Sequence, residues 1–178
     1  MKIAIVGLGV AAANAIRVIA AERPGATIEV FGAEPHLYYA RPKLPAFLAG
    51  EVEQSALYFY PPEWYRERGV TVHTGARVER IDPTAHRIII EGGASATYDR
   101  LLLANGARPF VPPIEGAGLP GVFSLWTIEH VLRIRAYAQG RRRAAVIGGG
   151  LLGLEAARGL HVRSEERRVG KECRSRWS

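Results

Sequence analysis

Residues 1–34 read MKIAIVGLGVAAANAIRVIAAERPGATIEVFGAE, and their pattern of apolar residues and glycines indicates how the chain folds. Lys2–Val6 is a short β-branched apolar run, and Val10–Glu22 carries apolar residues at helical spacing. Thr27–Phe31 is a second apolar run of the strand type. The order of strand, tight turn, helix and strand predicts a βαβ unit, and such a unit implies a parallel sheet.

The turn after the first strand, Gly7-Leu8-Gly9-Val10-Ala11-Ala12, is typical of phosphate binding. Gly7 permits a tight turn, Gly9 lets the backbone approach a pyrophosphate, and the small Ala12 lets the helix pack closely on the strand. The positive end of the helix then faces the phosphate oxygens. The residues predicted to bind a dinucleotide here are Gly7, Gly9, Val10, Ala11 and Ala12.

Glu34 supports this interpretation because it follows the second apolar run, 22 residues after Ala12. A carboxylate at this position can accept hydrogen bonds from both hydroxyl groups of a ribose. The alternative is a glycine-rich turn without a ligand, followed by a solvated glutamate.

The same pattern recurs near the other end of the chain. Ala144–Ile147 is a predicted strand, Gly148-Gly149-Gly150-Leu151-Leu152-Gly153 is a second glycine-rich turn, and Leu151–Leu160 is a predicted amphipathic helix. A dehydrogenase with one cofactor needs one such turn, whereas an enzyme that passes hydride from nicotinamide to flavin needs two. The residues predicted to hold the nicotinamide dinucleotide are Gly148, Gly150 and Gly153.

The segments between the two turns are shorter and less regular. Leu101–Ala104 is an uninterrupted apolar run that suits a central parallel strand, and Thr127–Gln139 has helical periodicity. Leu37–Gly50 is punctuated by proline and is predicted to be irregular. The other predicted elements are a short helix opened by Pro61-Pro62 and running through Glu67, and strands at Val70–Val72, Arg77–Ile81 and Arg87–Glu91.

Taken together, these motifs resemble the pyridine-nucleotide-dependent flavoprotein reductases. Beyond the two glycine turns, Tyr98–Pro109 (YDRLLLANGARP) is similar to the stretch after the FAD strands in that family, normally Ala-Thr-Gly-x-x-Pro. The resemblance implies that Ala104, Asn105 and Gly106 contact FAD, with Asn105 in place of the usual threonine. Asparagine keeps a polar side chain and suits a turn, so the role of the backbone at this position is expected to persist.

The loop Tyr39–Pro45 (YARPKLP), followed by Phe47–Gly50 (FLAG), is most similar to the rubredoxin reductase, ferredoxin reductase and nitrite reductase branch of that family. In that branch the loop runs along the FAD. The resemblance therefore implies that Arg41, Pro42 and Lys43 contact the cofactor, with Arg41 and Pro42 on its flavin side. The alternative is that Arg41 and Lys43 are ordinary loop cations.

Ferredoxin reductases often pair a lysine near the flavin with the glutamate of the second glycine motif. That glutamate is Glu155 in this sequence, which the resemblance implies to be the catalytic residue near the reacting rings. The position equivalent to the lysine is Ala46, and Lys43 lies three residues earlier. Disulphide reductases of the wider family carry a redox cysteine pair in this region; residues 1–162 contain no cysteine, so thiol chemistry is excluded for this part.

Composition narrows the remaining possibilities. The 178 residues are 48% hydrophobic and 23% charged, which provides enough apolar content for one good core. The net charge is +7, but residues 163–178 carry six Lys or Arg and three Glu, which leaves +4 for residues 1–162. No nucleic-acid-binding pattern surrounds the basic residues, and the five histidines lack metal-ligand spacing. We therefore predict neither a nucleic-acid partner nor a metal.

The N-terminal run could pass for a signal peptide, because it has one lysine, an apolar stretch and small residues. Its Gly-Leu-Gly turn and the polar Asn14 and Arg17 favour nucleotide binding instead, and the run is too short and too interrupted to span a bilayer. The one cysteine, Cys173, fits a reducing compartment. We predict a cytoplasmic location and no membrane partner.

The last sixteen residues, Arg163–Ser178 (RSEERRVGKECRSRWS), end the helical periodicity abruptly. They resemble the translation of a common DNA-sequencing adapter, so a non-native tail is predicted; the alternative is a genuine basic tail. A foreign tail would cut the protein just after its second glycine motif begins. The strand that carries the residue choosing NADH or NADPH would then be missing.

These observations predict an α/β fold: a Rossmann-like FAD-binding domain of a two-dinucleotide flavoprotein, then the truncated start of a second, NAD(P)-binding Rossmann domain. The predicted boundaries are 1–112 for the FAD domain, 113–126 for a linker, 127–162 for the start of the NAD(P) domain and 163–178 for the tail.

The predicted function of the parent protein is to pass electrons from NAD(P)H through FAD to an external acceptor. The acceptor is a small molecule or a protein, such as an iron-sulfur protein, a rubredoxin or a nitrite-reductase component. Two alternatives stay open. The chain is a partial nucleotide-binding fragment that is inactive on its own, or its parent is an FAD-linked NADH:quinone dehydrogenase.

Overall fold

The structure is a computed structural model that describes residues 1–163 and divides them into two compact units. Unit 1 comprises residues 1–42 and 54–117, and unit 2 comprises residues 43–53 and 118–163. Apart from Arg163, with which the last helix ends, the predicted tail lies outside the described residues.

Unit 1 is built on a four-stranded sheet with the order β3-β2-β1-β7, in which all neighbouring strands are parallel. Val6 at the end of β1 lies opposite Phe31 of β2 on one side and Leu103 of β7 on the other. The carboxyl ends of the strands therefore meet at one edge of the sheet. The strands are β1 (Lys2–Val6), β2 (Thr27–Phe31), β3 (Val70–His73) and β7 (Arg100–Leu103).

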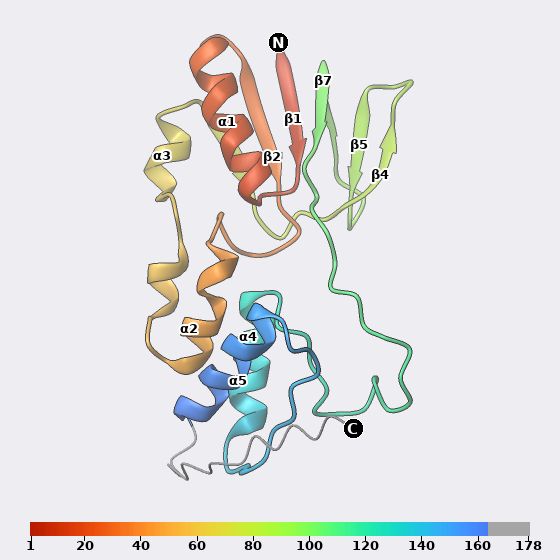
Figure 1. Cartoon of the computed structure of the whole chain (residues 1–178). Coiled ribbons are helices and arrows are strands. Elements are labelled where there is room, and N and C mark those ends of the chain that lie inside the picture. The colour runs from red at the N-terminus through yellow and green to blue at the C-terminus, as the bar shows by residue number, and fades with distance from the viewer. Residues whose placement is uncertain (164–178) are drawn as a thin grey trace. The chain divides into compact units, whose positions relative to one another are not determined.

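Helix α1 (Val10–Glu22) covers one face of this sheet (Figure 1). Its Ile16 packs against Ile5 and Ile28, and all three side chains are fully buried. The apolar stripe of α1 and the alternating residues of the strands explain this packing, because both direct their apolar side chains to the same layer. The predicted strand, turn, helix and strand over residues 1–34 are confirmed, with the predicted bounds.

A three-stranded antiparallel sheet lies on the other face of the parallel sheet (Figure 1). Its strands are β4 (Val78–Asp82), β5 (Arg87–Ile90) and β6 (Ser95–Thr97). Ile88 is fully buried and packs with Ala4 of β1 and Phe31 of β2. The sequence predicted β4 and β5 but missed β6, because three residues, one of them alanine, carry little strand signal of their own.

The segment before β3 forms the 3-10 turn η2 (Gln54–Leu57) and the short helix α3 (Pro62–Arg66). Proline in the first turn suits a helix start, as predicted, and Gly69 with its positive φ follows the end of the helix. Trp64 stacks on Tyr60 with 3.9 Å between ring centroids. Tyr65 is 2% exposed and packs into the core that α1 forms with the sheet.

Burial raises the pKa of Tyr65 to about 12. Because the folded pKa lies above the unfolded value near 10, the neutral phenol stabilises the fold below about pH 10, and this contribution is lost as the pH rises toward 12. We expect the free energy of unfolding, measured by urea titration, to fall between about pH 10 and about pH 12. Tyr65→Phe should remove a clear part of that fall; an equally steep fall in the variant would contradict this assignment.

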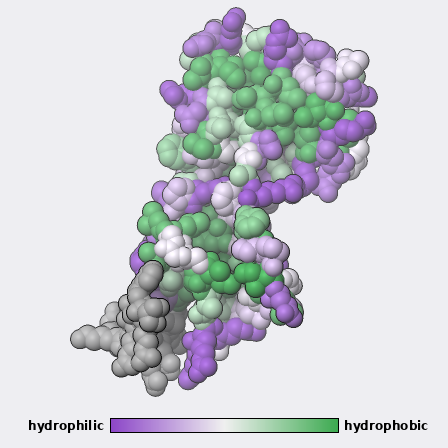
Figure 2. All heavy atoms as spheres, turned by 45° about the vertical axis from the view of Figure 1, so that its right-hand side comes forward, coloured by the Kyte–Doolittle hydropathy of each residue, from purple (hydrophilic) through white to green (hydrophobic). Residues whose placement is uncertain are grey.

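Strand β7 lies at an edge of the parallel sheet among the described strands, whereas Leu101–Ala104 was expected to be central. Leu103 is accordingly 56% exposed. The apolar run had suggested burial on both sides, but within residues 1–163 only β1 pairs with it. Figure 2 shows hydrophobic surface gathered over the part of the molecule that carries the two sheets.

Unit 2 consists of helices: α2 (Leu44–Ala49), α4 (Ile128–Ala138) and α5 (Leu151–Arg163). The predicted helix over 127–139 is confirmed as α4, where Thr127 caps the first turn by accepting a hydrogen bond from the backbone N–H of His130 at 3.2 Å. The prediction of irregular structure over 37–50 is wrong for α2, because proline at the start of a helix is compatible with it. The 3-10 turn η1 (Arg41–Lys43) leads into this helix.

The predicted strand Ala144–Ile147 is wrong, because residues 141–149 form no helix or strand. A strand needs a partner for its backbone N–H and C=O groups, and the described residues of unit 2 contain no strand to provide one. Ile147 is 81% exposed as a result. None of the helices within residues 1–163 combines the length and the apolar character that a membrane span requires.

Candidate functional site

The first glycine turn begins at Gly7, directly after β1. Gly7 has a φ of +104° and donates its backbone N–H to the carbonyl of Phe31 at 2.9 Å. A Cβ added to Gly7 would lie 2.2 Å from the carbonyl oxygen of Ala104 and 2.8 Å from the backbone nitrogen of Asn105. Glycine is therefore required at this position both for its backbone conformation and for the close approach of the chain after β7.

This approach brings together two segments that the sequence singled out separately. The backbone N–H of Ala104 donates to the carbonyl of Val6 at 2.8 Å, which continues the β1–β7 ladder by one residue. Asn105 and Gly106 follow beyond the carboxyl end of β7 and are exposed, and Gly106 has a φ of +68°. Gly7, Ala104 and Asn105 thus lie next to one another at the carboxyl end of β1. In the sheet, β1 lies between β2 and β7.

Gly9 occupies a different environment. It is the N-cap of α1, with extended backbone (φ −97°, ψ −167°), and a Cβ added there would have no atom within 4 Å. Neither a capping side chain nor an acidic residue occupies the first turn of α1. The first N–H groups of a helix lack partners within it, so those at Val10 and Ala11 can donate to an anion beside Gly9.

Ala12 serves packing. Its side chain is fully buried in the core between α1 and the sheet, whereas Val10 is 61% exposed. The small residue lets the start of α1 lie close to β1, as the sequence predicted. In this turn, Gly7 therefore provides the turn geometry, Gly9 leaves the backbone open, and Ala12 allows close packing.

Glu34 lies three residues beyond β2, at the same edge of the sheet. Its Oε1 accepts a hydrogen bond from Arg41 Nη2 at 2.6 Å, and its Oε2 accepts one from the Tyr39 hydroxyl at 2.5 Å. The Arg41 guanidinium also lies 5.3 Å from the centroid of the Tyr39 ring. Arg41, which the resemblance placed on the flavin side, is thus located beside the carboxylate expected to bind ribose.

The carboxylate of Glu34 keeps capacity for a ligand. Its side chain is 29% exposed, and each carboxylate oxygen has two lone-pair positions, of which Tyr39 and Arg41 use one each. The residues therefore fit the ADP half of a dinucleotide: an open backbone cradle at Gly9, a helix start without acids, and an oriented carboxylate. Tyr39 was missed because its position five residues after Glu34 follows no regular spacing.

The second glycine turn shares three local features with the first: a positive φ at its first glycine, open space beside its middle glycine and a hydrogen bond to the carbonyl of that glycine. Gly148 has a φ of +127°, Gly150 has no atom within 4 Å of an added Cβ, and the N–H of Leu154 donates to the carbonyl of Gly150 at 3.0 Å. The equivalent bond in the first turn joins Ala13 to Gly9 at 3.0 Å. An added Cβ at Gly153 would lie 2.0 Å from the carbonyl oxygen of Gly148, so the third small position is needed for close packing in this turn too.

The remaining predicted site residues lie in separate places. Pro42 ends the first stretch of unit 1, while the exposed Lys43 begins the 43–53 segment of unit 2 and caps α2. Glu155 is half-buried in the first half of α5. The roles expected for Pro42, Lys43 and Glu155 toward a flavin stay predictions.

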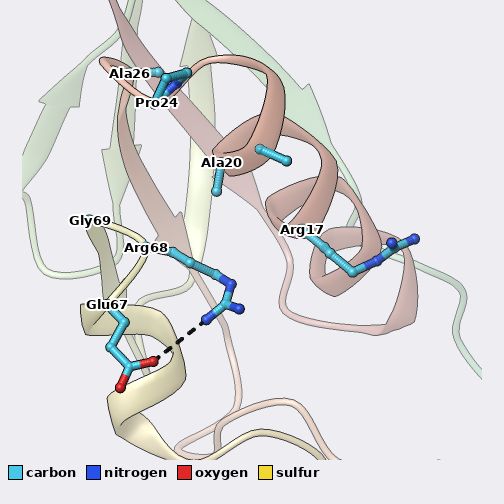
Figure 3. Close-up of a pocket in the computed structure, with 8 residues that line it drawn as sticks. Arg17, Ala20, Pro24, Ala26, Glu67, Arg68 and Gly69 are labelled. Atoms are coloured by element: carbon cyan, nitrogen blue, oxygen red, sulfur yellow. Dashed lines mark ion pairs between the residues drawn. The ribbon is translucent and has the colours of Figure 1, made fainter.

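A shallow pocket of about 630 Å³ lies elsewhere in unit 1 (Figure 3). It is formed by the last turns of α1 and the residues just before β3, so it lies at the end of α1 opposite the glycine turn. Cofactors in parallel α/β sheets bind at the carboxyl ends of the strands, and we do not assign the nucleotide to this pocket. Its lining residues are Arg17, Ala20, Ala21, Pro24, Ala26, Glu67, Arg68 and Gly69.

No group of three or more His, Cys, Asp or Glu residues within 1–163 is arranged to hold a metal ion. The groups that the described site offers to a ligand are backbone N–H groups beside small residues and one carboxylate.

Comparison with known proteins identifies the family. Residues 1–172 match the pyridine nucleotide-disulphide oxidoreductases. The chain belongs to this family. The resemblance drawn from the two glycine turns is thereby confirmed, and the Rossmann-like fold of the family agrees with the parallel sheet of unit 1.

Relatives within the family include several electron-transfer enzymes. The assimilatory nitrate reductase electron transfer subunit of Bacillus subtilis is 38% identical over 160 residues, which are 89% of this chain and 21% of that protein. Rhodocoxin reductase of Rhodococcus erythropolis is 34% identical over 158 residues, which are 88% of this chain and 37% of that protein.

Solved structures of the family are similar over most of the described chain. The water-forming NADH oxidase from Lactobacillus brevis, bound to NADH, has a TM-score of 0.81 at 27% identity, covering 91% of this chain and 37% of that one. The NADH:rubredoxin oxidoreductase from Clostridium acetobutylicum has a TM-score of 0.77 at 26% identity, covering 92% and 42%. The chain thus spans well under half the length of these relatives.

Proposed function

We propose that this chain carries the FAD-binding part, and the start of the NAD(P)-binding part, of a flavoprotein that passes electrons from NAD(P)H to an external acceptor. The observation that supports this most strongly is the pair of glycine turns, each with a positive φ at its first glycine and open space beside its middle glycine, one of which lies near a carboxylate. When bound, FAD would accept hydride from the nicotinamide and release electrons to the acceptor.

The first turn would hold the ADP half of FAD. Backbone N–H groups at the start of α1 donate to the pyrophosphate, and the open space at Gly9 lets the phosphate oxygens come close to the backbone. Glu34 accepts hydrogen bonds from the ribose hydroxyls while Tyr39 and Arg41 keep its carboxylate in one orientation. The segment Ala104–Gly106 borders the same edge from β7.

The second turn would hold the pyrophosphate of NAD(P)H through Gly148, Gly150 and Gly153. The solved oxidase from L. brevis bound to NADH, and its engineered form bound to NADPH, support a nicotinamide cofactor for this family member. Glu155 is the residue we assign to the reacting rings. The location is proposed to be cytoplasmic.

The acceptor is proposed from the relatives. Several are named as reductases of ferredoxin or rubredoxin, or as nitrate or nitrite reductase components. These names favour an iron-sulfur protein, a rubredoxin or a nitrite-reducing component over a quinone.

A second candidate is that the 178-residue chain is a nucleotide-binding unit without electron transfer. The observation that favours it is the unpaired stretch Ala144–Ile147, because a parallel strand normally supports such a glycine turn. A visible absorption spectrum of the purified chain with FAD, followed by anaerobic addition of NADH and of NADPH, separates the two. Bleaching of a bound flavin supports electron transfer from nicotinamide; a bound flavin that does not bleach supports the nucleotide-binding unit; and no bound flavin contradicts both.

Glu34→Gln is expected to weaken FAD binding about tenfold, because a hydrogen bond to a charged acceptor is stronger than one to a neutral amide oxygen by about 1–1.5 kcal/mol. Tyr39→Phe should weaken it by a smaller factor, since it removes one hydroxyl that orients the carboxylate but keeps the ring. Isothermal titration calorimetry measures both. The matched control is Glu22→Gln at the exposed end of α1, and an effect of Glu34→Gln no larger than that of this control would remove Glu34 from the site.

A further inference from the structure

Two parts of unit 2 that are more than a hundred residues apart in the sequence are joined by a bidentate ion pair (Figure 1 shows α2 and α5). Arg158 of α5 donates from Nη1 to Glu51 Oε1 at 2.6 Å and from Nη2 to Glu51 Oε2 at 3.0 Å. Two parallel hydrogen bonds fix the direction of both side chains as well as their distance. The pair therefore sets how α5 is rotated against the segment that contains α2.

The next residue in α5 sets the distance between the two helices. Gly159 is buried, and a Cβ added there would lie 3.0 Å from the carbonyl oxygen of Pro45 and 3.4 Å from the backbone nitrogen of Ala49. The backbones of α2 and α5 thus approach closely, and a side chain at this position would press them apart. Arg158 and Gly159 together define one docked arrangement.

The glycine turn and α5 form one continuous piece. Helix α5 begins at Leu151, directly after Gly150, and the packing of Gly153 against Gly148 fixes the turn to the first residues of the helix. Any rotation of α5 is therefore transmitted to the turn. What holds α5 also holds the backbone groups of Gly148–Gly153.

We infer that Glu51 and Arg158 are positioning residues, which dock α5 on α2 and thereby hold the second glycine turn in the orientation that receives the nicotinamide pyrophosphate. The inference rests on the proposed function of that turn. The hydrogen bond from Arg158 lowers the pKa of Glu51, and the hydrogen bond to Glu51 raises the pKa of Arg158, so both groups stay charged at neutral pH. The side chains are 38% and 51% exposed, which limits the expected effect to about threefold.

Hydrogen exchange of the complete chain, followed by mass spectrometry of peptides covering 154–160, tests the docking of α5 without any ligand, because the N–H of Leu154 donates to Gly150 and the amides after it lie inside α5. Glu51→Gln should speed exchange there about threefold, Arg158→Lys should have a smaller effect because one charge contact remains, and the exchanged pair E51R/R158E should restore slow exchange. The control is Glu53→Gln, an exposed glutamate two residues along the same segment. Unchanged exchange in Glu51→Gln, or an equal change in Glu53→Gln, would overturn the inference.

NADH titration of the same variants distinguishes this inference from the proposed function. We expect the wild-type chain to bind NADH, Glu51→Gln to bind it about threefold more weakly, and E51R/R158E to recover the affinity. This result would support both the positioning role and the proposed nicotinamide site. Equal NADH affinity in wild type and Glu51→Gln would overturn the positioning role. If the wild type does not bind NADH, the proposed nicotinamide site fails, while the exchange measurement still decides whether the pair docks α5.

Discussion

Gly7→Ala is expected to lower the free energy of unfolding by about 3 kcal/mol or more, and the Tm by roughly 10 °C. Two causes add. The φ of +104° is strained for any residue with a side chain, and the new Cβ would lie 2.2 Å from the carbonyl oxygen of Ala104. The atoms that the new Cβ would meet are backbone atoms of Ala104 and Asn105, so no flexible side chain can move away. The carboxyl ends of β1 and β7 would have to separate instead.

Thermal unfolding followed by circular dichroism measures this effect. The matched control is Gly9→Ala two residues later, where an added Cβ meets open space and the backbone is already extended. We expect this control to unfold within about 1 kcal/mol of the wild type, the usual range of an N-cap substitution. Equal stability of the two variants would contradict the packing assigned to Gly7.

Gly9→Ala has the second large expected effect, which is on the ligand. Because nothing in the protein fills the space beside Gly9, the methyl group would stand where the pyrophosphate approaches the start of α1. We expect FAD affinity to fall by about ten- to a hundredfold, which corresponds to the cost of overpacking by one methyl group. The fold should persist.

Calorimetric titration of FAD into wild type and Gly9→Ala tests this expectation, with thermal unfolding of the same samples to show that the variant is folded. Alanine substitution at Gly25, an exposed glycine that likewise has no atom near an added Cβ, serves as the control. Unchanged FAD affinity in a folded Gly9→Ala would mean that the phosphates bind elsewhere.

The first βαβ unit could be predicted from the sequence because all its determinants are local. The apolar runs, their spacing and the turn between them lie within residues 1–34, and β1, α1 and β2 have the predicted bounds. The contact between Gly7 and Ala104 depends on strand order, which periodicity does not encode. Even so, both segments were singled out, because each carries its own turn signal.

The errors have long-range causes. The helical state of Leu44–Ala49 is stabilised by burial against helices that begin about eighty or more residues later, so its proline-containing sequence looked irregular. Ala144–Ile147 has a good strand sequence but no partner strand among the described residues of its unit. In both cases the tertiary environment overrides local propensity.

The site followed the same division. The small residues of the turns could be predicted, because each is required for a local physical reason. The contacts of Tyr39 and Arg41 with Glu34 could not, because they depend on the path of the loop after β2. The ion pair between Glu51 and Arg158 joins residues with no sequence signal at all.

We propose that the ADP half of FAD binds where the parallel strands of unit 1 end. Calorimetric titration of the complete chain with FAD and, separately, with FMN tests this site, because FMN has the flavin but lacks the adenosine phosphate. We expect that FAD binds, that ADP competes with it, and that FMN binds at least tenfold more weakly. Equal binding of FMN and FAD, or no binding of FAD, would contradict the proposal.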